Sequence, residues 1–241
     1  MNAFVASTLP IFLDFTSFLI ALPRSYRFDT IPRMTAEPRF WFLARKLQAL
    51  AQTGLEFSTN EYDRERYELT SKLAAELMAE HCDTPVEKFT AMFDVQRGYA
   101  TPKVDVRAAV FRDGKILLVR EAADGLWTMP GGWSDVNDSP HEAVEREVWE
   151  ESGFRVKAVK LAAVYDRAKH PHLPPLPFHV YKMCFVCEIL GGEPAVSREI
   201  LEVGFFSPDA LPPLSISRIL EFQIQRMFEH AKNPSLATDF D

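Results

Sequence analysis

The chain has 241 residues, of which 47% are hydrophobic and 25% charged, and its formal net charge is −7. This length and composition suit one sizeable folded core with a smaller partner. The acidic balance argues against a nucleic-acid polymer as the main ligand, because proteins that bind such polymers present a basic surface.

Residues 1–33 combine an apolar stretch with interruptions. Residues 4–22 are largely apolar, but Pro10 and Asp14 interrupt them and no Lys or Arg precedes them. A signal peptide carries basic residues before its apolar core, and a spanning helix needs about 20 clean apolar residues. We therefore expect a poorly ordered extension and no membrane partner. The alternative is that this segment anchors the protein at a membrane surface. Release of the protein from membrane fractions on deletion of residues 1–33 would support that alternative.

Residues 34–95 show helical spacing and predict a small all-α N-terminal domain. Two sets of residues carry this pattern: Trp41, Phe42, Leu43, Leu47, Leu50 and Ala51 in the first, and Tyr67, Leu69, Leu73, Ala74, Leu77 and Met78 in the second. The module either covers an active site or forms a dimer contact, and we expect a homodimer. Residues 96–103 read as a linker.

Residues 104–232 mix strand and helix signals. Two strands at residues 104–111 and 115–120 flank an Asp113-Gly114 hairpin turn. Mixed elements of this kind predict an α/β fold, an α/β/α sandwich with a mixed sheet, and not a serial βαβ array. Residues 233–241 read as a disordered tail. The later expected elements are strands at residues 156–166, 178–189 and 203–206 and an amphipathic helix at 215–231.

One run, from Gly132 to Phe154, reads G-x5-D-x7-R-E-V-x-E-E-x-G-F. A Ser-x-x-Glu capping box at residues 139–142, with proline at the first helical position, predicts a helix that begins near residue 140. Gly153 predicts a left-handed C-terminal cap. The helix therefore spans three to four turns, roughly, on the spacing of its start and stop signals.

Three carboxylates share one stripe of this predicted helix, and the stripe adjoins the apolar face formed by Ala143, Val144 and Val148. A solvated helix face is the ordinary explanation of such a charge run, but it would oppose the apolar face. Oxygen ligands of this kind suit hard divalent cations. Arg146 can pair with Glu150 and offset part of the repulsion.

The run resembles the signature of the Nudix hydrolases, G-x5-E-x7-R-E-U-x-E-E-x-G-U, in which U is aliphatic or aromatic. Asp138 stands where the family usually has glutamate. The helical module followed by Tyr-x-Thr-Pro-Lys-Val-Asp-Val-Arg looks like a bacterial Nudix subgroup associated with ADP-ribose or CDP-choline type substrates. The resemblance implies hydrolysis of a small nucleotide, a nucleoside diphosphate linked to a moiety X, into nucleoside monophosphate and phosphorylated X.

The resemblance also implies roles for individual residues. Glu147, Glu150 and Glu151 would bind Mg²⁺ or Mn²⁺, and one of them would serve as the base. Arg146 would orient the glutamates, and the backbone carbonyl of Gly131 would be a further metal ligand. Arg146, Glu147 and Glu150 are thus the candidate catalytic residues.

Four residues are candidate substrate contacts: Trp133, Arg167, His170 and Glu199. Trp133 could stack on a base, and Arg167 and His170 lie in a proline-rich loop after the box. Three of them have an ordinary alternative, which is structural packing for Trp133, a solvated surface for His170 and a solvated turn for Glu199. His172, in the same loop, is likewise expected at the surface.

Two other features bear on function. Three cysteines imply no disulfide framework and suit a reducing cytoplasm. Cys184 and Cys187 form C-x-x-C inside a predicted strand, where they would face opposite sides and hold no zinc. A non-catalytic nucleotide-sensing Nudix module is the alternative to a hydrolase, and a membrane-associated scaffold is a third reading that rests only on residues 1–33.

Overall fold

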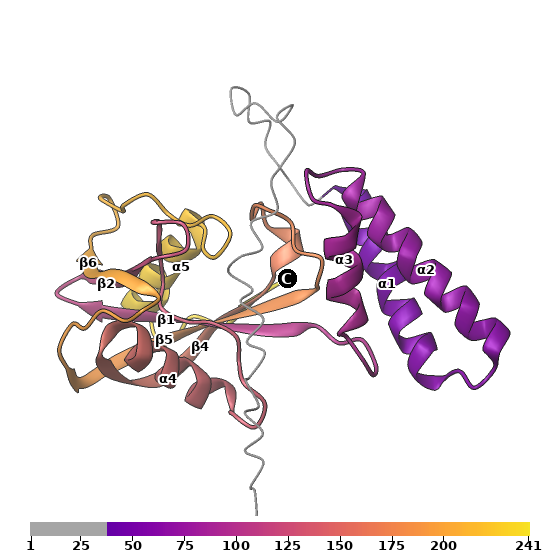
Figure 1. Ribbon diagram of the computed structural model, residues 1–241. Helices are drawn as coiled ribbons and strands as arrows, with labels where there is room; N and C mark the ends of the chain where they lie inside the picture. Colours follow the sequence, from indigo (N-terminus) through magenta and orange to yellow (C-terminus); the bar gives the residue numbers. More distant parts are fainter. Residues whose placement is uncertain (1–37) are drawn as a thin grey trace, which may run out of the picture.

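The computed structural model describes residues 38–241, and Figure 1 shows a helical unit beside a sheet that is covered by helices. The extension expected at residues 1–33 lies outside the described residues. None of the helices in the described part has the length and the apolar run needed to cross a bilayer.

The helical unit contains α1 (Arg39–Phe57), α2 (Glu61–Ala79) and α3 (Val86–Asp94). Asn60 begins α2, because its side chain accepts hydrogen bonds from the backbone N–H groups of Tyr62 and Asp63. Trp41, Met78 and Phe89 form the centre of its core and are almost fully buried. The two helices predicted by spacing are confirmed, and α3 is a third one that completes this core.

Seven strands form the sheet: β1 (Lys103–Arg112), β2 (Lys115–Glu121), β3 (Trp127–Thr128), β4 (Phe154–Asp166), β5 (Val180–Gly192), β6 (Ile200–Phe206) and β7 (Asp239–Phe240). Their order is β3-β2-β1-β5-β4-β7, and β6 pairs with β2. The β1–β5 pair is parallel and the β4–β5 pair antiparallel, so the sheet is mixed, as predicted. Asp113 and Gly114 both have positive φ and make the expected hairpin turn between β1 and β2.

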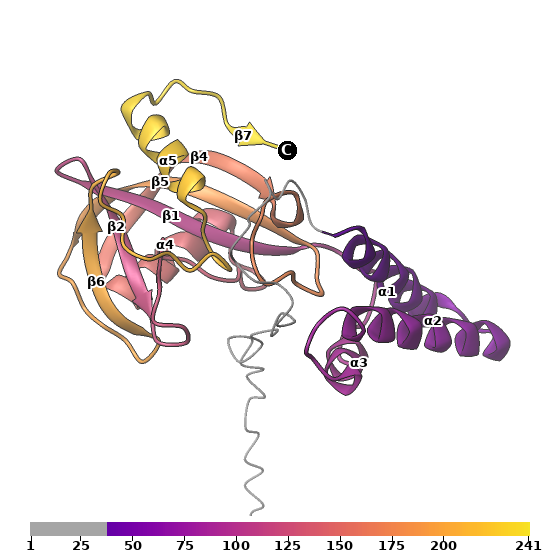
Figure 2. The same cartoon turned by 90° about the horizontal axis from the view of Figure 1, so that it is seen from above.

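Helices α4 (Pro140–Ser152) and α5 (Glu221–Lys232) lie on opposite faces of the sheet (Figure 2). Alternation along β1 sends Val110 under α4 and Ala109 under α5. Cys184 and Cys187 likewise lie in the cores on opposite sides, and both are free thiols. The α/β/α sandwich and the separation of the two cysteines are therefore confirmed.

Two expectations about the C-terminal region are wrong. The last helix begins at Glu221 instead of near residue 215, because Leu214 bridges to Trp127 and the Ser215 backbone N–H donates to the Trp127 carbonyl. Residues 233–241 are not a disordered tail throughout: β7 pairs with β4, and Asp239 pairs with Arg226 at 2.8 Å.

Candidate active site

The helix that carries the acidic run is α4, and its ends are those that the sequence predicts. The Glu142 carboxylate accepts a hydrogen bond from the Ser139 backbone N–H at 3.0 Å. Gly153 ends the helix with φ 76°, in the left-handed region. Ala143, Val144 and Val148 are fully buried against the sheet, so the glutamates on the adjoining stripe are held at the edge of the core.

Two glycines bring the preceding loop up to α4. Gly131 has φ 139°, and a Cβ atom there would lie 2.0 Å from the Val106 carbonyl oxygen. A Cβ atom on Gly132 would lie 2.9 Å from Glu147 Oε2. The Gly131 backbone N–H donates to Glu151 Oε2 at 2.8 Å. The absence of a side chain at Gly131 therefore lets the loop lie against the backbone of β1, and the absence of one at Gly132 lets it lie against Glu147.

Arg146 forms ion pairs with several carboxylates of the acidic run. Its Nη1 atom lies 3.0 Å from both Glu147 Oε1 and Glu150 Oε2, so the expected Arg146–Glu150 pair is present. Its Nε donates to Asp138 Oδ2 at 3.2 Å. Asp138 precedes the helix and thus pairs with a different nitrogen of Arg146 from the one that contacts the glutamates.

Glu147 and Glu151 are the enclosed carboxylates of the run. Burial raises the pKa of Glu147 and raises the pKa of Glu151 well above its usual range. Within residues 38–241, the hydrogen-bond partner of the Glu151 side chain is the Gly131 N–H, and it has no ion-pair partner. Arg107 acts on the Glu151 carboxylate through space but forms no ion pair with it. A buried carboxylate without an ion-pair partner is a ligand that suits a hard divalent ion, so these residues fit such an ion.

In the described part of the chain, no three His, Cys, Asp or Glu side chains converge on one point that could hold a metal ion. The reason lies in α4 itself: Arg146 holds Glu147 and Glu150, whereas Glu151 turns toward Gly131. Binding of an ion by all three glutamates therefore requires a change of side-chain rotamers.

A pocket of about 420 Å³ opens beside α4. Met92 of α3 and the segment from Pro174 to Phe178 form part of its wall, so the helical unit contributes to it. The pocket brings together most of the predicted site residues: Gly131, Trp133, Arg146, Glu147, Glu151, Arg167 and Glu199. Glu150 is outside this lining, on the exposed side of α4.

The structure places the two histidines of the loop elsewhere than expected. His170 lies outside the pocket lining, with its Nε2 3.1 Å from Asp241 Oδ1 and its ring against Tyr165, and its role as a substrate contact stays a prediction. His172 is 4% exposed rather than a surface residue, and its Nδ1 lies 2.9 Å from the Ile216 carbonyl. Arg167, by contrast, lines the pocket and donates to the Pro174 carbonyl at 2.8 Å.

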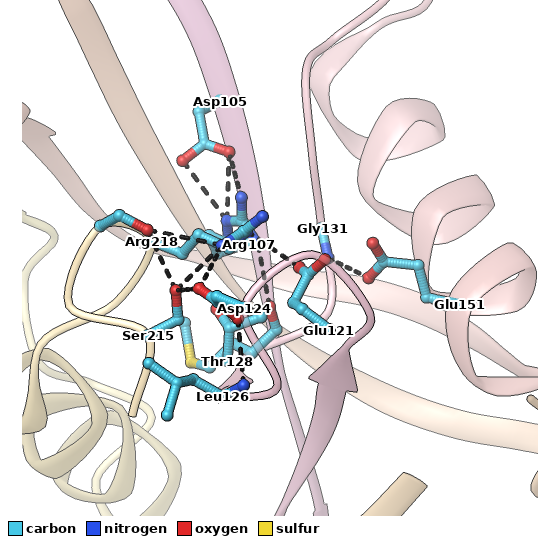
Figure 3. Close-up of polar contacts among 12 residues, drawn as sticks. Asp105, Arg107, Glu121, Asp124, Leu126, Thr128, Gly131, Glu151, Ser215 and Arg218 are labelled. Carbon is cyan, nitrogen blue, oxygen red and sulfur yellow. Dashed lines mark hydrogen bonds and ion pairs between the residues drawn. The ribbon is translucent and has the colours of Figure 1, made fainter. Parts of the chain in front are cut away.

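Three pocket residues on the sheet were missed by sequence reasoning. Asp105 and Arg107 project from β1, and Lys182 projects from β5 beside them. Arg107 Nη2 donates to Asp105 Oδ1 at 2.9 Å, and the Lys182 ammonium donates to Asp105 Oδ2 (Figure 3 shows the Asp105–Arg107 pair). Charged residues at alternate positions of an otherwise apolar strand were the signal that could have revealed Asp105 and Arg107.

A second group lies at the other end of this wall. Glu121, at the end of β2, pairs with Arg218 Nε at 3.1 Å, and Arg218 Nη1 donates to Asp124 at 2.8 Å (Figure 3). Burial raises the pKa of Glu121 although Arg218 opposes the shift. No local pattern in the sequence marks this pair, because its members are almost a hundred positions apart.

Comparison with known proteins agrees with this geometry. Residues 101–223 match the NUDIX domain, and residues 38–93 match the UDP-X-like N-terminal oligomerisation domain. The chain belongs to the Nudix hydrolase family. It is therefore an enzyme of the class that hydrolyses a diphosphate bond.

Individual Nudix proteins are similar over much of the chain. YjhB of Bacillus subtilis, which bears a provisional ADP-ribose pyrophosphatase name, is 44% identical over 82% of this chain and 95% of its own. The crystal structure of an ADP-ribose pyrophosphatase from Streptococcus suis is 42% identical, with a TM-score of 0.53, over 58% of this chain and 100% of that one. The structure of a UDP-X diphosphatase is 33% identical, with a TM-score of 0.54, over 84% and 98% of the two chains.

Proposed function

We propose that this Nudix enzyme cleaves a nucleoside diphosphate linked to a moiety X, of the ADP-ribose or CDP-choline type, into nucleoside monophosphate and phosphorylated X. We also propose that it depends on Mg²⁺ or Mn²⁺. The observation that carries the proposal is the enclosed Glu151 carboxylate, which accepts a hydrogen bond from the Gly131 backbone N–H, has no ion-pair partner among the described residues and lines a pocket of about 420 Å³.

Glu147, Glu150 and Glu151 would hold the metal, with the Gly131 carbonyl as a further ligand. A divalent ion held by these residues would neutralise charge on the diphosphate and would lower the pKa of an attacking water. Arg146 keeps Glu147 and Glu150 in place, since its Nη1 lies 3.0 Å from each. Glu147 lines the pocket and is mostly enclosed beside the loop at Gly132, which suits it to accept a proton from water in the pocket.

The substrate type is inferred from similarity. The relatives named above act on ADP-ribose in one case and on UDP-X in another. Trp133 and Phe178 supply apolar surface in the pocket for a base or a sugar, and Arg167 adds a cation held by backbone carbonyls. A pocket of about 420 Å³ has room for a small nucleotide and excludes a polymer from its interior.

The test is phosphate release, coupled through a phosphatase, across a panel of compounds with Mg²⁺ or Mn²⁺. The panel contains ADP-ribose, CDP-choline, a UDP-sugar, NADH and a dinucleoside polyphosphate, with E151Q as the control. We expect metal-dependent release from at least one compound and its loss in the control. Nucleotide binding without cleavage of any compound would instead favour the nucleotide-sensing alternative.

We further propose that the chain forms a homodimer through the helical unit. Phe42, Leu50, Leu69 and Leu73 on α1 and α2 are each at least half exposed, and the matched N-terminal domain is described as an oligomerisation domain. Light scattering of L50E/L69E against the wild type tests this, because two buried charges at the interface should yield monomers. A dimer unchanged in mass would place the interface elsewhere.

We propose a reducing, cytoplasmic location as well. Cys82, Cys184 and Cys187 are buried and free, which suits a compartment that keeps thiols reduced. Fractionation of cells, with and without deletion of residues 1–33, tests the location and the membrane-surface alternative together.

A further inference from the structure

The inner wall of the pocket carries a buried trio of charged side chains. Asp105 on β1 and Lys182 on β5 are register partners in the parallel pair of strands. Arg107 donates to Asp105 Oδ1 from Nε at 3.1 Å and from Nη2 at 2.9 Å, and Lys182 donates to Oδ2. All three side chains are less than a tenth exposed and all line the pocket.

The trio has more positive than negative charge. Two cations share one carboxylate, and together they hold the pKa of Asp105 below its usual range although burial acts to raise it. Burial lowers the pKa of Lys182 to about 8, which leaves most of the ammonium protonated at pH 7. Lys182 is therefore a charged group in this wall, not a neutral amine.

The neighbours of Lys182 do not offset this charge. Burial lowers the pKa of His172 to about 2, and burial raises the pKa of Cys184 to about 12, so both are neutral at pH 7. Two further carboxylates act on Arg107 through space: Glu151, which the proposed function assigns to the metal, and Glu121, which pairs with Arg218. If a metal ion binds Glu151, neither Glu151 nor the paired Glu121 offsets the net positive charge of Asp105, Arg107 and Lys182.

Lys182 also has unused hydrogen-bonding capacity. An ammonium has three N–H donors, and the acceptor found for it within residues 38–241 is Asp105. A buried cation with free donors is costly unless a ligand supplies an acceptor and a negative charge. Phosphate oxygens supply both.

We infer that Lys182, together with Arg107, forms a subsite for a substrate phosphate on the sheet side of the pocket, opposite the glutamates of α4. The inference rests on the proposed function, because it takes a diphosphate as the substrate. One phosphate of the diphosphate lies toward α4 and its metal, and the other lies toward Lys182. Lys182 is thus a specificity-determining residue that distinguishes two linked phosphates from one.

The test is calorimetric titration of the full-length protein, in Mg²⁺, with methylenediphosphonate and with inorganic phosphate. The first probe has two linked phosphonates and no hydrolysable bond, so the readout does not depend on turnover. We expect K182M to weaken the diphosphonate by at least about tenfold and to leave the phosphate affinity within about twofold. K157M, which removes an exposed lysine of the neighbouring strand β4, is the matched control and should change neither value.

Lys182 could instead serve only as the counter-ion that keeps Asp105 folded, and the two-probe design separates this role. A structural role would weaken both probes equally or change neither in the folded variant, and either result overturns the inference. If K182M unfolds, K182Q is the second variant, because it keeps a hydrogen-bond donor for Asp105 and loses only the charge. Failure of the wild type to prefer the diphosphonate also overturns the inference.

The outcome is independent of the proposed hydrolysis. Binding that depends on Lys182 in a protein that cleaves no compound of the panel would support the subsite and contradict the proposed substrate type. Cleavage that is retained together with Lys182-independent binding would support the activity and refute the subsite.

Discussion

The two walls of the pocket handle negative charge in opposite ways. On the α4 wall, one arginine holds Glu147 and Glu150, and Glu151 is enclosed with a backbone N–H as its partner. On the sheet wall, Asp105 and Glu121 each pair with an arginine, and Lys182 adds a further cation. The carboxylates of the sheet wall are thus paired with cations of that wall, whereas Glu151 on the α4 wall has no ion-pair partner among the described residues.

The largest expected effect contrasts one carboxylate from each wall. We expect E151Q to lower kcat by at least about 10²-fold with folding intact, because it removes charge at the proposed metal. E121Q should leave Mn²⁺ affinity within about threefold, since Arg218 already neutralises Glu121. Mn²⁺ titration and steady-state kinetics on both variants check this. Equal losses of metal affinity would abolish the distinction between the walls.

The next effect concerns the glycine loop that joins the walls. G131A should lower the free energy of unfolding by about 2–4 kcal/mol, because its Cβ atom meets the Val106 carbonyl and its φ is strained. G191A is the control: a Cβ atom there meets nothing within 4 Å, so a change below about 1 kcal/mol is expected. Urea unfolding compares the two. A tolerated alanine at position 131 would show that the loop can shift.

The burial of His172, with Lys182 and Arg167 acting in the same direction, predicts a pH dependence of stability. His172 has a pKa of about 2 in the folded protein, below the ordinary value of 6.5. The unfolded chain therefore binds a proton that the folded chain does not, and stability falls as pH drops below 6.5, by at most about 1.4 kcal/mol per pH unit. H172Q should show a shallower fall between pH 7 and pH 5 in urea unfolding.

A matched control exists for this prediction. H141Q removes an exposed histidine at the start of α4 and should retain the steep fall of the wild type. Parallel stability curves for H172Q and the wild type would mean that His172 becomes protonated in the folded state, and would contradict the lowering of its pKa by burial.

The smallest expected effect is at the departure from the family signature. Asp138 contacts only the Nε side of Arg146, at 3.2 Å, and is about one-third exposed. D138E should therefore change kcat by no more than about threefold, the scale of an exposed ion pair. Kinetics of D138E beside D138N measure this. A loss above tenfold in D138E would mean that the residue acts on the metal side of α4.

The two walls also differ in how far the sequence predicts them. The α4 wall lies within one run of 23 residues from Gly132 to Phe154, so its helix caps, apolar face and carboxylate stripe can all be derived from spacing. The Gly131 approach was predicted as well, on the family resemblance. Spacing in the sequence does not give side-chain rotamers, so it does not reveal that Glu150 points away from the pocket and Glu151 points toward Gly131.

The sheet wall joins residues that are remote in sequence. Lys182 meets Asp105 only because β5 runs parallel to β1, a pairing that local patterns do not encode. Arg218 meets Glu121 because the segment before α5 bridges to β3 instead of extending the helix. The same long-range pairing explains the error at the C-terminus, where Asp239 is held by Arg226 and by β4.

The contact between α1 and the pocket wall has one more consequence. Arg45 donates to the Leu176 carbonyl at 3.0 Å, and Met92 of α3 lines the pocket itself. The boundary of the sandwich and the boundary of the binding site therefore do not coincide, because without the helical unit the pocket would lose Met92 and the loop would lose the hydrogen bond from Arg45. In evolution, the helical unit and the loop that it holds would have to change together for this chain to acquire a new substrate.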